Sequence, residues 1–136
     1  MRVLLDLNVL LDFLLDREPW SAEAAEVWKA HHTKLLTGVV SAASLPTVFY
    51  LVQRAEGREY ALTSVRLLFD EFEIAAVDLT TVQSALTMSG VDFEDNLQIA
   101  CAIQHNADAI VTRDPDDFIA SPVPIMSPAE LLRTLS

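Results

Sequence analysis

Acidic side chains occupy three places in the sequence from which they could act together chemically. Asp6 directly follows the apolar run RVLL, and Asp114 comes just after the run AIVT. A third group stands close together further along the chain and comprises Asp92, Glu94 and Asp95. Carboxylates that converge in one cleft repel each other, and a hard divalent cation with oxygen ligands relieves that repulsion. A carboxylate–metal site of this kind can activate water and stabilise attack on a phosphodiester.

Each acidic group also has a purely structural interpretation. Asp92 could be a helix N-cap, and the two acids after it could be favourable charges at a positive helix end. Asp114 to Asp117 could form an Asp-Pro turn. Asp6 is harder to explain in this way, because a charge straight after a buried strand is unusual unless it is paired. No lysine lies near it in sequence. The three placements together therefore favour a site.

Short apolar runs alternate with amphipathic stretches along the chain, which predicts strands alternating with helices. The expected strands are residues 2–5, 37–40, 74–77, 109–112 and a weak edge strand at 123–126. The expected helices are residues 8–16, 20–34, one N-capped by Ser44, 58–72, 80–89, 92–106 and 128–135. This pattern indicates a parallel α/β sheet covered on both faces, whose ligands bind beyond the carboxyl ends of the strands. If the first and fourth strands are neighbours, all three acidic groups meet at that edge.

Length and composition indicate a single globular domain spanning residues 1–136. Hydrophobic residues make up 51% of the chain and charged residues 21%, with no linker-like or low-complexity segment. A lone cysteine, Cys101, excludes an internal disulfide and fits a reducing compartment. Aspartates interrupt the first sixteen residues, which argues against a signal peptide or a membrane-spanning helix. We therefore expect a cytoplasmic protein with no membrane partner.

The charge of the chain is strongly acidic. Twenty acidic residues against nine basic ones give a net charge of −11, and only two of the basic residues are lysines. That is the wrong sign for a nucleic-acid partner, because affinity for phosphate normally comes from Lys and Arg. A charge excess of this kind also occurs simply as a solvated surface. Oxygen-only candidate ligands and the lack of a Cys/His cluster favour Mg²⁺ or Mn²⁺ over zinc.

Three motifs in order resemble the PIN-domain family, and especially its VapC-type toxins. They are D-x-N-x-L-L-D from Asp6 to Asp12, D-x-x-x-x-A-x-A from Asp95 to Ala102, and V-T-R-D-x-x-D-F from Val111 to Phe118. The resemblance covers essentially the whole chain. It implies a Mg²⁺- or Mn²⁺-dependent endoribonuclease, paired with an antitoxin and built as a three-layer α/β/α domain. It further implies a five-stranded parallel sheet of order 3-2-1-4-5 and a homodimer.

Carried over position by position, the resemblance assigns roles to several residues. Asp6, Asp95 and Asp114 match the acidic metal-site positions, and Asp117 matches the aspartate of the D-F pair. Asn8 matches a small polar residue that braces the first aspartate. Thr112, which lies in the third motif, is expected to support the same site.

The chain departs from the family pattern at one place. Many members carry a glutamate early in the helix after the second strand, whereas no acid occurs here from Ser41 to Arg54. Thr47 is the nearest polar match. Asp92 could compensate as a further metal ligand, because it lies one helical turn from Asp95.

Arginines at the rim of the cleft would help an acidic protein to bind RNA. Arg113 is adjacent to the predicted site, and the further candidates are Arg17, Arg54 and Arg58.

Two other classes of protein compete with a nuclease. A haloacid-dehalogenase or receiver-type phosphatase also places aspartates at strand ends. Such sites usually need a late lysine and Asp-x-Asp after the first strand, whereas here both lysines precede residue 35 and Asn8 takes the second place. The other alternative is a degenerate PIN-like domain that binds RNA or a protein without cutting, which the missing glutamate at Thr47 keeps open.

Overall fold

Five short strands lie in parallel, in the order β3-β2-β1-β4-β5, in the computed structural model, which describes residues 1–136. They are β1 (Arg2–Leu5), β2 (Thr37–Ser41), β3 (Glu73–Ala75), β4 (Ala109–Val111) and β5 (Ile125–Met126). Val3 of the central strand pairs with Gly38 on one side and Ala109 on the other. The parallel sheet and the predicted strand order are both confirmed.

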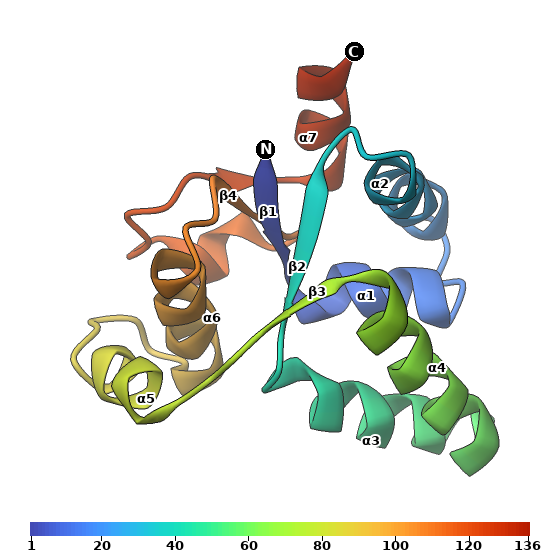
Figure 1. Ribbon diagram of the computed structural model, residues 1–136, viewed down its shortest axis with the longest axis horizontal. Coiled ribbons are helices and arrows are strands. Elements are labelled where there is room, and N and C mark those ends of the chain that lie inside the picture. The colour runs from blue at the N-terminus through green and yellow to red at the C-terminus, as the bar shows by residue number, and fades with distance from the viewer.

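Helices cover both faces of this sheet, which gives three layers (Figure 1). The helices are α1 (Leu7–Leu14), α2 (Ser21–His32), α3 (Ser44–Glu56), α4 (Arg58–Glu71), α5 (Leu79–Leu86), α6 (Phe93–Gln104) and α7 (Pro128–Leu135). A short 3₁₀ turn, η1 (Pro115–Phe118), follows β4. None of the helices combines the length and the apolarity that crossing a membrane requires.

The alternation of side chains along the strands builds two separate cores. Val3 and Leu5 point to one face, where α1, α2, α3, α4 and α7 pack, whereas Leu4 points to the face covered by α6. All three side chains are almost completely buried. The unbroken apolar run Val3–Leu5 of β1 is thereby explained, because both faces of the strand are covered.

Several helices end earlier than their apolar pattern predicted. We expected helices to residues 16, 34 and 106, but they end at Leu14, His32 and Gln104. Just beyond these ends the backbone of Asp16, Lys34 and Asn106 turns to positive φ, at 50°, 65° and 57°. A left-handed residue of this kind cannot continue a right-handed helix, and it commonly terminates one.

The prediction that Ser44 caps its helix is wrong. Ser44 is itself the first residue of α3, and Ala43 precedes it without any side-chain cap. The Ser41 hydroxyl instead accepts a hydrogen bond from the Ala43 amide, at 3.2 Å. This arrangement leaves the Ser44 hydroxyl free to face the neighbouring helix α6.

Candidate active site

A pocket of about 400 Å³ opens at the carboxyl edge of the sheet, where the predicted site was expected. Its walls come from the N-terminal ends of α1, α3 and α6, together with the ends of β1 and β2. Figure 1 shows β1 and β2 running toward the same edge, from which α1 and α3 begin. Helix N-termini carry partial positive charge, so three of them around one pocket favour anionic groups inside it.

Asp6 forms the buried part of this pocket and is only 8% exposed. It ends β1 and caps α1, since its Oδ1 accepts a hydrogen bond from the Leu7 amide at 2.8 Å. Burial raises the pKa of the Asp6 carboxyl, and the charge of Asp114 raises it slightly further. Hydrogen bonds from Thr112, Leu7 and Gln98 oppose that shift because they favour the charged form.

Thr112 is the residue that braces Asp6, as predicted for a supporting role. Its hydroxyl donates to Asp6 Oδ2 at 2.8 Å and accepts from the Asp114 amide at 3.0 Å. Asn8, which was expected to brace the first aspartate, contacts other groups instead. Its Nδ2 donates to Asp114 Oδ2 at 2.9 Å and to the Thr112 hydroxyl at 3.3 Å. Asn8 therefore orients Asp114, and Thr112 lies between the two aspartates.

Asp95 is half-buried and lines the same pocket as Asp6. Burial, followed by the charges of Asp92, Asp6, Asp117 and Glu94, raises the pKa of Asp95 to about 7. The charge of Asp6 thus acts on Asp95 across the pocket. Burial and the neighbouring negative charges make the ionised form of Asp95 unfavourable, and a bound cation would offset that cost.

Asp92 does not supply the missing acidic group in the way the sequence suggested. Its Oδ1 accepts a hydrogen bond from the Asp95 amide at 3.1 Å, so it is the N-cap of α6. Its side chain does not line the pocket, whereas that of Glu94 does. Thr47, at the family's glutamate position, also lines the pocket. An acid is therefore present in the pocket from α6 rather than from α3.

Asp114 and Asp117 lie outside the walls of the pocket. The Asp114 side chain is about half exposed, at 50%. No group of three or more His, Cys, Asp or Glu side chains is placed so that together they could hold a metal ion. The donors of the pocket nevertheless suit Mg²⁺, because that ion commonly takes one or two protein carboxylates and keeps several water molecules.

Gln98 is a site residue that the motifs did not reveal. Its Nε2 donates to Asp6 Oδ1 and to the Ser44 hydroxyl, each at 3.4 Å, and its Oε1 is buried without a partner. A signal for it existed, since Gln98 follows Asp95 by three residues and so shares its side of the helix. Ser44 could have been found from its place just beyond β2.

The predicted arginine rim is not formed at this pocket, because none of the residues that line it is basic. Arg113 pairs with the buried Asp12, with Nε to Oδ2 at 2.7 Å, and stacks 3.9 Å from the Trp20 ring centre, while its Nη1 lies 3.9 Å from Asp114 Oδ2. Arg17 lies 3.8 Å from the same carboxylate.

The two remaining arginines lie further away. Arg54 stands over the Tyr50 ring near the end of α3, ten residues and thus about 15 Å along the axis from Ser44. Arg58 begins α4, just beyond that end of α3.

Comparison with known proteins identifies the family. Residues 2–116 match the family described as PIN domain, which is most of the chain. The chain belongs to the PIN-domain family, as its three motifs predicted. No curated protein matches the sequence significantly.

Solved structures of similar fold agree with this assignment. DNA-bound VapBC from Salmonella typhimurium superposes with a TM-score of 0.74 at 15% identity, over 94% of this chain and 98% of that chain. A toxin–antitoxin complex from Klebsiella pneumoniae gives 0.70 at 18% identity, over 93% and 97%. VapC20 from Mycobacterium tuberculosis, described as a sarcin–ricin loop cleaving toxin, gives 0.70 at 12% identity, over 85% and 92%. The fold is therefore that of VapC-type toxins.

Proposed function

We propose that this protein is a Mg²⁺- or Mn²⁺-dependent endoribonuclease that hydrolyses RNA phosphodiester bonds in the cytoplasm. The observation that carries the proposal is the pairing of Asp6 and Asp95 in one pocket, each with a raised pKa. Carboxylates crowded in this way are typical of a site that receives a cation. The description of VapC20 as a loop-cleaving toxin supports RNA as the class of substrate.

In this proposal Asp6 and Asp95 hold the cation, and Glu94 is the third acid that lines the pocket. A divalent cation bound there would activate water and offset the charge that develops on the phosphodiester. Thr112 and the Leu7 amide hold the Asp6 carboxylate in a fixed orientation. The N-terminal ends of α1, α3 and α6 provide amide groups and partial positive charge for an RNA phosphate. Asn8 fixes Asp114 beside the pocket, where it would tune the site through its charge.

Cleavage of a single-stranded RNA with Mg²⁺, Mn²⁺ or EDTA tests this proposal. We expect cleavage with either metal and none in EDTA. Asp6→Asn should abolish it without unfolding the protein, because asparagine keeps the shape but removes the charge. Asp70→Asn, an exposed change on α4, is the matched control. Near-wild-type, EDTA-sensitive cleavage by Asp6→Asn would contradict the assigned role of Asp6.

A catalytically inert PIN domain that binds RNA or a protein is the second candidate. It is favoured by the neutral Thr47 in the pocket and by the lack of a three-acid metal group. Binding of RNA with no metal-dependent cleavage under any of these conditions would select it. The phosphatase alternative loses its support, because the chain belongs to the PIN-domain family.

We further propose that the protein is the toxin of a toxin–antitoxin pair and forms a homodimer. The similar fold of the complex from Klebsiella pneumoniae supports the first part. The net charge of −11 suits a basic segment of an antitoxin, because opposite potentials steer association. Light scattering of the purified protein, alone and mixed with the product of a neighbouring gene, measures both assemblies. A monomer whose mass does not change when that product is added would contradict this part of the proposal.

A further inference from the structure

The pocket has no cationic side chain with which to hold RNA. None of its lining residues is Lys or Arg, and Arg113 and Arg17 are engaged by Asp12. Phosphate contacts from basic residues normally supply most of the affinity of a protein for nucleic acid. A cation held by two carboxylates would do little more than offset their charges. Beyond the partial positive charge of the helix N-termini, affinity for RNA at this pocket therefore needs chemistry other than basic side chains.

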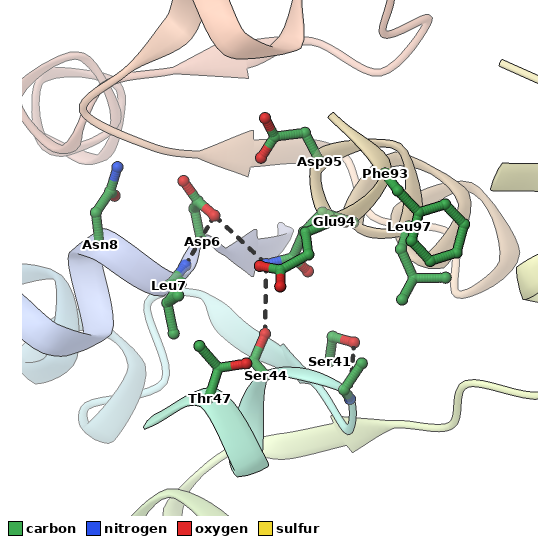
Figure 2. A pocket seen from close by; sticks show the side chains of 12 residues that line it. Asp6, Leu7, Asn8, Ser41, Ser44, Thr47, Phe93, Glu94, Asp95 and Leu97 are labelled. Carbon is green, nitrogen blue, oxygen red and sulfur yellow. Dashed lines mark hydrogen bonds between the residues drawn. The ribbon is translucent and has the colours of Figure 1, made fainter. Parts of the chain in front are cut away.

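Phe93 offers that chemistry at the wall of the pocket. It begins α6 and is 44% exposed, although a large aromatic ring gains stability from burial. Leu97 lies one turn further along the same side of α6 and also lines the pocket. Figure 2 shows Phe93 and Leu97 together on one side of the pocket, with Asp6 and Asn8 on the other. Helix α6 thus brings an apolar, aromatic patch to the pocket beside its own acids Glu94 and Asp95.

Neutral hydrogen-bonding groups complete the pocket. Ser44, Thr47 and Gln98 line it, and Gln98 Oε1 is buried without a partner. Both contacts of the Gln98 amide as donor are 3.4 Å long, beyond the usual range, so they hold it only weakly. An amide that turned toward the pocket would gain a partner from any N–H donor placed there.

We propose that this pocket seats an unpaired nucleobase of single-stranded RNA, stacked on Phe93 and hydrogen-bonded by the Ser44–Gln98 side. The inference rests on the proposed function and deepens it by naming the substrate as RNA with an unstacked base beside the bond to be cut. A base in a duplex is stacked on both faces and paired along one edge, so it cannot enter. Stacking on an aromatic ring also explains how an acidic protein binds RNA with few phosphate contacts.

Binding is measured on the Asp6→Asn protein, so that the RNA stays intact, by fluorescence anisotropy with a short single-stranded RNA that the wild type cleaves. Phe93→Ala should weaken binding about 10- to 100-fold, the usual range for one base stacked on an aromatic side chain. Phe93→Tyr should restore it. Phe69→Ala, an exposed change on α4 outside the pocket, should leave it unchanged.

RNAs with single abasic positions identify the seated base. Removing the base at one position should weaken binding to the protein that keeps Phe93. The same abasic RNA should bind Phe93→Ala about as well as intact RNA does, because the stacking interaction is already absent. The inference would be overturned if Phe93→Ala did not change the affinity for RNA. It would also be overturned if Phe93→Ala weakened binding of intact RNA and of every abasic RNA by the same factor. If the wild-type protein cleaves RNA but Phe93→Ala does not change RNA binding, only this inference fails. If it cleaves no RNA at all with Mg²⁺ or Mn²⁺, the proposed function itself fails.

Discussion

Replacing Asp95 with asparagine should raise the melting temperature of the metal-free protein at pH 8. Folding raises the pKa of Asp95 from 3.8 to about 7, chiefly through burial and then through neighbouring carboxylates. Because the folded state binds this proton more tightly than the unfolded state, stability is lost as the pH rises from about 4 through 7. Asparagine cannot ionise, so the mutant escapes that loss.

The size of the effect follows from the shift and from the exposure of the group. A shift of about three pKa units corresponds to about 4 kcal/mol of unfolding free energy. Asp95 is only half-buried, so solvent screening reduces this to about 1–2 kcal/mol. Losing the favourable charge at the start of α6 removes about 0.3–1 kcal/mol. The net gain is about 1 kcal/mol, or about 3–4 °C in melting temperature for a chain of this length.

The assay is thermal melting of both proteins in EDTA and in excess Mg²⁺, at low salt, at pH 8 and pH 5. The advantage of Asp95→Asn in EDTA should be much smaller at pH 5, because most of the loss of stability occurs between pH 5 and pH 7. Mg²⁺ should raise the melting temperature of the wild type more than that of the mutant, because binding stabilises the folded state. A mutant that melts lower than the wild type at pH 8 in EDTA would refute the claim that ionised Asp95 destabilises the folded protein. If Mg²⁺ also had no effect on the wild type, Asp95 would be a plain helix-start charge.

Three further substitutions test other parts of the structure. Thr47→Ala should leave metal-dependent RNA cleavage near the wild-type level, because a neutral hydroxyl brings no charge to a cation; a loss as severe as that of Asp6→Asn would contradict this. Asp12→Ala should lower the unfolding free energy by about 1.5–3 kcal/mol in urea denaturation, because the charged hydrogen bonds between Asp12 and Arg113 are lost; an unchanged midpoint would show that the pair contributes nothing. Gly90→Ala should also destabilise the protein in the same assay, because a Cβ there would lie 2.2 Å from Asn96 Oδ1, and a stability equal to that of the wild type would mean that Asn96 moves aside freely.

The parts of the site that sequence alone could predict are those set by local pattern. Asp6 was identifiable because it directly follows the unbroken apolar run Val3–Leu5 of β1, and the cap role of Asp92 follows from its place before α6. Family motifs then supplied Asp95 and Asp114. Each of these inferences depends on neighbours in the chain rather than on packing. They were therefore available before the structure was known.

Contacts between distant segments decided what could not be predicted. Gln98 and Ser44 are 54 residues apart, and they meet only because α3 and α6 converge on one pocket. Arg113 stands next to Asp114 in sequence and was expected to face RNA, but its guanidinium turns to Asp12, 101 residues away. The direction of a long side chain depends on the partner that the fold brings to it. Sequence adjacency to a site does not reveal that partner.

The central place of β1 in the sheet has a consequence for the protein during its synthesis. Thr112, which orients the Asp6 carboxylate, is made 106 residues after Asp6. β2 can join β1 as soon as β2 has been made, whereas the other edge of β1 stays open until β4 emerges. Pairing over such a long separation is intrinsically slow, and the open edge is prone to aggregation meanwhile. The Asp6 carboxylate therefore lacks its orienting contact from Thr112 until β4 has been made and has paired with β1.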